Sequence, residues 1–155
     1  MKSPAQYFRA GVGAAIVNHA GLVLALERAD IPGAWQLPQG GLQASESPVQ
    51  AVFREVHEET GIPPSALALL DTYPEPLAYE LPLAAWSQKT GRGQVGYWFL
   101  LQFHGSEAAI KLERAAEFSS WQWLPFGRVV RGVVDFRKPV YRRLLKRFKP
   151  YLRDS

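Results

Sequence analysis

The segment "SESPVQAVFREVHEETGIPP", residues 45–64, constrains the fold of this chain more than any other stretch. Ser47 is a good helix N-cap, Pro48 suits the first helical position, and Gln50 completes a capping box of the form S-x-x-Q. Gly61 suits the left-handed position that ends many helices, and Pro63 follows closely. These start and stop signals predict a helix over residues 48–60.

The residues of this helix separate into an apolar stripe and an acidic face. At about 100° per residue, four apolar residues fall on one stripe that we expect to face the core. They are Val49, Val52, Phe53 and Val56. Three glutamates fall on an adjacent arc, so their carboxylates share one face beside the stripe. They are Glu55, Glu58 and Glu59.

The ordinary interpretation of such a cluster is a solvated acidic face, in which Arg54 pairs with Glu58 four residues later. Two effects weigh against it. The carboxylates lie near the C-terminal end of the helix, where the helix dipole disfavours negative charge, and they repel one another at spacings of three and four residues. A divalent cation removes both penalties, and Mg²⁺ prefers carboxylate oxygens. The cluster therefore predicts a cation site.

Runs rich in β-branched and aromatic residues predict strands on both sides of this helix. The expected strands cover residues 11–18, 22–29, 95–103 and 118–124, and one or two more lie within 67–82. Helical stretches are expected at 125–136 and 138–152, and Pro139 can start the second. This order predicts an α+β fold, or a mixed sheet between helices, in one domain over residues 1–155.

The last helical stretch carries an apolar stripe that should pack on the body of the protein. Its members are Tyr141, Leu144, Leu145 and Phe148. The basic residues beside it form either a solvated face or a face that attracts phosphate. We expect the 5 tryptophans of the chain to lie mostly in the core.

Composition narrows the classes of function. The chain has no cysteine, which excludes a disulfide framework, a zinc–thiolate site and a thiol nucleophile. The net charge of +4 and the pI of about 9.5 favour anionic partners such as nucleic acid or nucleotides. No apolar run approaches the length of a membrane span, and the N-terminus lacks the pattern of a signal peptide. We expect a soluble, cytoplasmic protein with no membrane association.

A wider pattern surrounds the acidic helix. Gly40, five residues, Glu46, seven residues and then "REVHEETGI" match the full Nudix box, G-x5-E-x7-R-E-U-x-E-E-x-G-U, where U is a bulky aliphatic residue. Over residues 40–62 the chain thus resembles the Nudix hydrolase superfamily. The resemblance implies a mixed β-sheet sandwiched between α-helices, with the box forming a loop, a helix and a loop. It also implies hydrolysis of a nucleoside diphosphate linked to another group, dependent on Mg²⁺ or Mn²⁺, with two or more cations.

The resemblance also implies roles for the residues of the box. The three glutamates of the helix would be metal ligands, and one of them, Glu55 or Glu59, would act as general base. Arg54 would orient the carboxylates, and Gly40 would offer its backbone carbonyl to a metal. Glu46 would anchor the loop. Metals make water nucleophilic and neutralise phosphate oxygens, so the chemistry needs no serine or cysteine nucleophile.

The flanks of the box resemble the subfamily that contains bacterial RNA pyrophosphohydrolases and dinucleoside polyphosphate hydrolases. The similar segments are "FRAGVGAAIVN", "WQLPQGG", "YELP", "EFSSWQWLP" and "FRKPVYRRLLKRF", and they span most of residues 8–148. The resemblance implies that Glu117 is a further metal ligand. It also implies four residues that contact the RNA 5′ end or its phosphates. These are Arg28, Gln39, Tyr79 and Arg137.

The chain departs from this subfamily at three places. Arg9-Ala10-Gly11 stands where the family often has Arg-Pro-Asn, and Arg137 replaces the usual lysine. The apolar "LAAW" replaces a basic segment expected after "YELP". These changes touch the RNA contacts and leave the catalytic centre intact.

Three functions remain open from the sequence. The first is removal of pyrophosphate, or of phosphate in steps, from the 5′-triphosphate of RNA. The second is asymmetric cleavage of diadenosine tetraphosphate to ATP and AMP. The third, a non-catalytic module that senses a nucleotide or binds RNA, is disfavoured because such modules lose a box glutamate and this chain keeps all of them. Both a monomer and a homodimer are compatible with the sequence.

Overall fold

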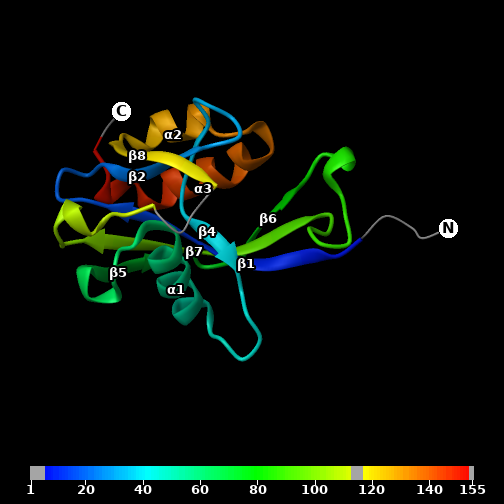
Figure 1. The fold of residues 1–155 in the computed structure, drawn as a ribbon, viewed down its shortest axis with the longest axis horizontal. Coiled ribbons are helices and arrows are strands. Elements are labelled where there is room, and N and C mark those ends of the chain that lie inside the picture. The colour runs from blue at the N-terminus through cyan, green and yellow to red at the C-terminus, as the bar shows by residue number, and fades with distance from the viewer. Residues whose placement is uncertain (1–5, 113–116, 154–155) are drawn as a thin grey trace.

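The computed structural model of the protein describes residues 6–112 and 117–153. An eight-stranded mixed sheet carries helix α1 (Pro48–Thr60) on one face and helices α2 (Phe126–Gly132) and α3 (Lys138–Phe148) on the other (Figure 1). The predicted α+β architecture, a mixed sheet between helices, is confirmed.

The sheet is built around a parallel pair of long strands, β1 and β7. The strands are β1 (Phe8–Val17), β2 (Val23–Arg28), β3 (Trp35–Gln36), β4 (Gln39–Gly41), β5 (Leu67–Thr72), β6 (Leu77–Glu80), β7 (Gly93–Phe103) and β8 (Phe118–Leu124). Their order is β3-β2-β1-β7-β5, and β8 pairs with β2. Short strands β4 and β6 pair with the N-terminal halves of β1 and β7. The start of β1, strand β6 and the loop that leads into β7, residues 7–10 and 77–93, extend from the body as an arm (Figure 1).

Side chains of β1 alternate between the two faces of the sheet, as strand geometry requires. Val12, Ala14 and Ile16 pack in the layer that contains α1. Ala15 and Val17 pack in the layer that contains α2 and α3. Each helix layer thus has its own apolar core.

The predicted limits of α1 are confirmed. The Gln50 backbone N–H donates to the Ser47 hydroxyl over 3.2 Å, and the Gln50 side chain accepts from the Ser47 N–H over 3.0 Å. Gly61 ends the helix with a φ of 78°, a conformation that favours glycine. The helix therefore begins and ends where its caps place it.

The expected apolar stripe of α1 needs one correction. Val52 and Val56 are buried, as predicted, but Val49 is 39% exposed. The first turn of α1 leads out of the loop that hangs away from the sheet, so Val49 has no sheet to pack against (Figure 1). Ala51 and Thr60 are buried instead.

Two further expectations are also corrected. Helix α2 ends at Gly132 rather than continuing to residue 136, because glycine and the two valines after it are poor helix formers. Among the tryptophans only Trp98 is buried. The other four are half-buried: Trp35, Trp121 and Trp123 pack against the edges of the core, and the indole N–H groups of Trp86 and Trp123 donate to Leu81 O and to Glu107.

The expected stripe of α3 is confirmed: Tyr141, Leu144 and Phe148 are fully buried, and Leu145 packs against the same core. In the described part of the chain, no helix is long and apolar enough to cross a membrane.

Candidate active site

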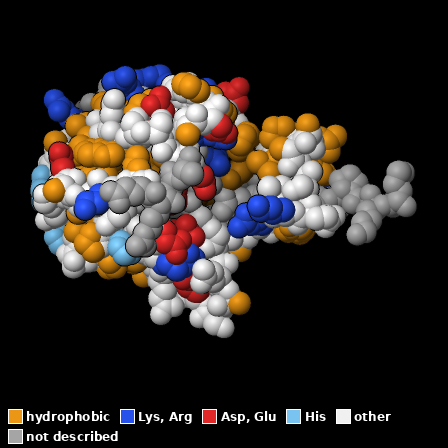
Figure 2. All heavy atoms as spheres, viewed as in Figure 1, with side chains coloured by type: hydrophobic (Ala, Val, Ile, Leu, Met, Phe, Trp, Pro, Cys, Tyr) orange, Lys and Arg blue, Asp and Glu red, His pale blue; other side chains and the backbone are white. Residues whose placement is uncertain are grey.

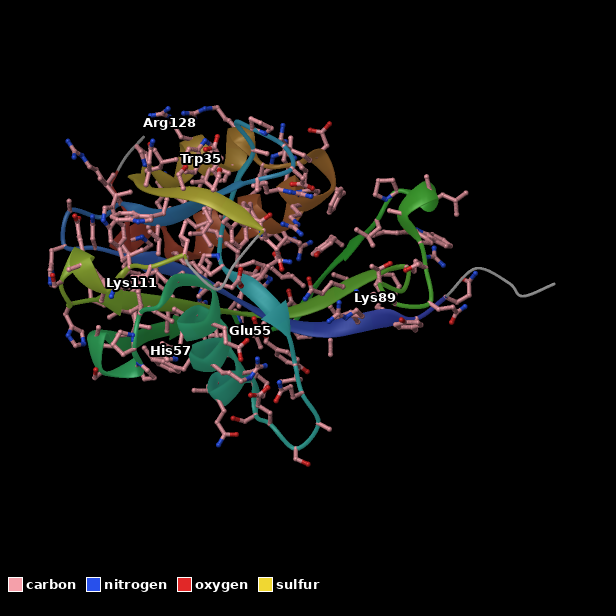
Figure 3. The ribbon with its side chains drawn as sticks, in the orientation of Figure 1. Trp35, Glu55, His57, Lys89, Lys111 and Arg128 are labelled. Atoms are coloured by element: carbon pink, nitrogen blue, oxygen red, sulfur yellow. The ribbon has the colours of Figure 1, made fainter. Side chains whose placement is uncertain are left out.

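Strand β4 and helix α1 bring the two ends of the box together. Gly40 lies opposite Val12 of β1, which fixes β4 at the sheet edge beside the helix. Glu55 extends from α1 toward β4 (Figure 3). A Cβ atom on Gly40 would lie only 2.0 Å from the Glu55 carboxylate. The glycine of the box is therefore needed to let this carboxylate approach the backbone.

Arg54 joins the loop of the box to the helix. Its Nε and Nη2 donate to the two oxygens of Glu46 over 2.6 and 2.9 Å, and Nη2 also donates to Gly41 O over 2.8 Å. Its Nη1 donates to Glu55 over 2.8 Å and to Glu58 over 3.2 Å. Arg54 thus orients the carboxylates, and Glu46 anchors the loop to it. The hydrogen bond from Arg54 holds the pKa of Glu46 below its usual range.

Glu59 is the most perturbed carboxylate of the site. Its Oε1 accepts a hydrogen bond from the Gln39 backbone N–H over 3.0 Å. Burial raises the pKa of Glu59 well above its usual value, and the negative charges of Glu55 and Glu117 raise it further. Because the Glu59 carboxyl is costly to ionise without a nearby positive charge, its position suits a bound cation.

Glu55 and Glu58 differ in their surroundings. Burial raises the pKa of Glu55, although the hydrogen bond and charge of Arg54 oppose the change. Glu58 is more open, with 51% of its side chain exposed. The acidic side chains gather around a basic group at α1 (Figure 2). The helix therefore presents two half-buried carboxylates, Glu55 and Glu59, and one exposed carboxylate, Glu58.

A cleft of about 490 Å³ lies between this helix, the arm and the body. It collects most of the predicted site residues, which are Gly40, Glu55, Glu58, Glu59, Glu117, Gln39, Tyr79 and Arg137. Glu117 is exposed at a turn before β8, and its backbone carbonyl accepts from the Ala29 N–H over 2.8 Å. The structure thus brings Glu117 to the same cleft as the box, although it is distant in sequence.

Arg28 lies in a second hollow, of about 460 Å³, which shares Gln36, Glu117 and Arg137 with the first. Its guanidinium donates twice to Asp30, over 2.9 and 2.8 Å, and this pairing raises the pKa of Arg28. Phosphate would therefore compete with Asp30 for this side chain.

Arg137 stands between the two hollows. Its Nη1 donates to the Gln36 side chain over 2.6 Å, and its guanidinium lies 5.6 Å from the ring centres of both Tyr79 and Phe136. Gln36 fixes this arginine and was not among the expected site residues. Arg137 lies in the turn before α3 and Gln36 in β3, so their contact joins segments that are far apart in the sequence.

Gln94 and Arg9 also line the cleft and were not among the expected site residues. The Gln39 amide donates to Tyr79 Oη over 3.1 Å and to Gln94 Oε1 over 3.0 Å, and Tyr79 Oη donates to Gln94 Oε1 over 2.7 Å. A Cβ atom on Gly11 would lie 1.7 Å from the Gln94 amide nitrogen. Gly11 of β1 is therefore the sequence signal that the Gln94 side chain passes over this strand.

The side chains present fit a divalent cation. The donors are carboxylates of α1 and Glu117 with the Gly40 carbonyl, all hard oxygen ligands that suit Mg²⁺ or Mn²⁺. This set of hard oxygen donors around one cleft supports the fit, and the raised pKa of the half-buried Glu59 agrees with it. In residues 6–112 and 117–153 no three acidic, His or Cys side chains already form a metal cluster, and Arg54 holds two of the carboxylates.

The model of the NUDIX domain family matches residues 7–148 of the chain. The chain belongs to the NUDIX family. The predicted family resemblance is confirmed.

Two bacterial NUDIX relatives share most of their length with this chain. It is 40% identical over 148 residues to the RNA pyrophosphohydrolase of Xanthomonas campestris pv. campestris, covering 92% of this chain and 72% of that protein. It is 38% identical over 150 residues to the RNA pyrophosphohydrolase of Zymomonas mobilis, covering 94% of this chain and 97% of that protein.

The crystal structure of a MutT protein from Methanosarcina mazei matches this NUDIX fold with a TM-score of 0.70. The match covers 95% of this chain and 99% of that chain. At 23% identity it supports the fold alone.

Proposed function

We propose that this NUDIX hydrolase is an RNA pyrophosphohydrolase that removes pyrophosphate, or phosphate in steps, from the 5′-triphosphate end of RNA. The product is RNA with a 5′-monophosphate. One observation carries the proposal: a single cleft joins the box carboxylates to Gln39, Tyr79 and Arg137, the residues expected at the RNA 5′ end. The two relatives named RNA pyrophosphohydrolase support it.

The polyphosphate would lie along the cleft, and the side chains of the chain would hold it there. Arg137 supplies a positive charge in the wall between the two hollows, where charge-assisted hydrogen bonds to phosphate are strong. Tyr79 and Gln39 hold each other through Gln94, so their polar groups are fixed before substrate arrives.

Hydrolysis needs a water that loses a proton as it attacks phosphorus. Glu59 and Glu55 are the candidates to accept that proton, because burial raises the pKa of each carboxyl, which makes each a stronger base. Arg54 keeps Glu55 oriented, and the Gln39 N–H keeps Glu59 oriented. These two contacts fix both carboxylates relative to β4.

Divalent cations, Mg²⁺ or Mn²⁺, would be held by Glu55, Glu58, Glu59, Glu117 and the Gly40 carbonyl, and would supply charge neutralisation and an acidified water. We expect either ion to raise the melting temperature, because binding to the folded state stabilises it. A chelator that changes neither melting temperature nor activity would contradict the metal role.

The experiment compares triphosphate-ended RNA with diadenosine tetraphosphate, each with Mg²⁺, by kcat/KM. We expect the RNA to be the better substrate and to yield a 5′-monophosphate end. Cleavage of diadenosine tetraphosphate with none of RNA would make the dinucleoside activity the correct one. Binding of either compound without cleavage would indicate the non-catalytic module. The cytoplasmic location stays a prediction, and the choice between a monomer and a homodimer stays open.

A further inference from the structure

Strand β8 has a β-bulge near its beginning. Glu27 of β2 lies opposite Ser120 of β8. The next residue of β2, Arg28, lies opposite Phe118, so Ser119 is an extra residue in β8. A bulge bends its strand, changes where the nearby side chains point, and is frequent beside active sites. This bulge therefore decides the direction of the side chains where β8 begins.

The packing of β8 shows that the bulge breaks the alternation of its side chains. On a regular strand, residues three positions apart point to opposite faces of the sheet. Phe118 and Trp121 are three positions apart, yet both pack in the layer that contains α1. Regular alternation would also place Glu117 on the face of Trp121. With the bulge, Glu117 is instead exposed and lines the active-site cleft.

The carboxylate of Glu27 holds this bulge. The Ser120 hydroxyl donates to Glu27 Oε1 over 2.9 Å, and the Ser119 hydroxyl donates to the same oxygen over 3.4 Å. The other oxygen, Oε2, accepts from the Gly33 backbone N–H over 2.8 Å. One half-buried carboxylate thus joins the bulge of β8 to the loop of residues 29–34.

The loop of residues 29–34 in turn holds the backbone of Glu117. The Ala29 N–H donates to the Glu117 carbonyl over 2.8 Å. Glu27 therefore contacts both segments that fix this residue, the bulge after it and the loop beside it. Glu27 is not among the described residues that line either hollow. Any effect of Glu27 on the site must therefore pass through the residues that it holds.

We propose that Glu27 is a positioning residue for Glu117. By holding the bulge of β8 and the loop of residues 29–34 together, it sets the direction of the Glu117 carboxylate in the cleft. The proposal rests on the metal role that the proposed function gives to Glu117. It adds that the affinity of the cleft for a divalent cation depends on a carboxylate that lies outside both the Nudix box and the cleft.

The test measures the affinity of the protein for Mn²⁺ by electron paramagnetic resonance, without substrate. Glu27→Ala removes the contacts to Ser119, Ser120 and Gly33, and we expect the affinity to fall about 10- to 100-fold, as for other groups that orient metal ligands. Glu27→Gln should stay close to the wild type, because the amide oxygen can accept from Gly33 and the amide N–H can donate to a serine hydroxyl. This variant removes the charge and keeps the contacts. Ser120→Ala, which removes one contact of the bulge, should lower the affinity by a smaller factor than Glu27→Ala.

A double-mutant cycle separates positioning from general stability. Glu117→Gln should itself lower the affinity for Mn²⁺, and adding Glu27→Ala to it should lower the affinity no further, because residues that act through one another are not additive. Glu107→Ala is the matched control: Glu107 also accepts from a residue of β8, the Trp123 indole N–H, over 2.9 Å. Its removal should leave the affinity unchanged. Circular dichroism and melting temperature verify that each variant folds.

Equal losses of affinity in Glu27→Ala and Glu27→Gln would show that the charge of Glu27 matters and its contacts do not, which would overturn the proposal. Wild-type affinity in folded Glu27→Ala, or a further loss when it is added to Glu117→Gln, would overturn it as well. These results leave the proposed function standing if the wild type binds Mn²⁺ and cleaves triphosphate-ended RNA. A wild type that binds Mn²⁺ normally but cleaves no RNA would remove the proposed function alone. A wild type that binds no Mn²⁺ would remove both.

Discussion

Tyr141 links helix α3 to the segment that enters the Nudix box, and removing its hydroxyl should destabilise the protein measurably. The Leu37 backbone N–H donates to Tyr141 Oη over 2.8 Å, and both residues are fully buried. Leu37 lies between β3 and β4, two residues before Gln39. Tyr141→Phe keeps the ring and its packing but leaves that N–H without a partner.

The expected magnitude follows from the burial of this hydrogen bond. An unsatisfied buried donor costs roughly 1–3 kcal/mol, so we expect the free energy of unfolding to fall by about 2 kcal/mol. For a chain of this size that corresponds to a loss of about 4–8 °C in melting temperature. Urea denaturation followed by circular dichroism measures the change, and Tyr151→Phe at an exposed position is the control.

The same tyrosine predicts a difference in alkaline stability. Burial raises the pKa of Tyr141 from 10.0 to about 12. Because the folded-state pKa is the higher one, the contribution to stability is complete below pH 10 and is lost as pH rises through 12. A shift of this size is worth about 2–3 kcal/mol, so the wild type should lose its advantage over Tyr141→Phe across that range. The quantity to compare is the difference in urea midpoint between the wild type and Tyr141→Phe. A difference that is the same at pH 8 and at pH 11.5 would refute this reasoning.

Three substitutions in the box are expected to separate chemistry from folding. Glu59→Gln should lower kcat by about 10²–10⁴-fold. Stability without divalent cations should stay equal or rise, because the substitution removes the repulsion from Glu55 and Glu117. Near-normal turnover would end the catalytic assignment of Glu59. Gly40→Ala should displace the Glu55 carboxylate, which lies 2.0 Å from the new Cβ position. We expect kcat to fall by about 100-fold with only a small change in melting temperature. An unchanged kcat would show that this carboxylate has room to move. Arg54→Lys keeps the charge but loses the fork that holds both oxygens of Glu46, so kcat and melting temperature should both fall; wild-type values for both would contradict the bridging role.

The helix of the box was predictable because its signals are local. The caps at Ser47 and Gly61 fix both ends through hydrogen bonds and a backbone conformation that depend on neighbouring residues alone. The role of Arg54 was only partly predictable. The sequence suggests its pair with Glu58, but its shortest contact is to Glu46, which depends on how the loop folds back.

Side chains that meet across the fold were not predictable from patterns. Gln39, Tyr79 and Gln94 come from three strands, and their network exists because β4 and β6 flank the pair of β1 and β7. Val49 was wrongly predicted to be in the core. Helical periodicity shows which side of the helix a residue faces, but not whether the sheet extends far enough to cover it. Arg28 was expected to bind phosphate, and its pairing with Asp30 follows from the turn after β2, which brings the two together.

The central claim, that the glutamates of α1 in this cleft hydrolyse the 5′-triphosphate of RNA, is tested most directly by analysing the products. Triphosphate-ended RNA is incubated with Mg²⁺ and either the wild type or Glu59→Gln, and the 5′ ends and released phosphates are identified. We predict 5′-monophosphate RNA with pyrophosphate, or with phosphate released in steps, from the wild type and little product from the folded variant. RNA that keeps its triphosphate in the presence of the folded wild type, or equal product from both proteins, would contradict the claim.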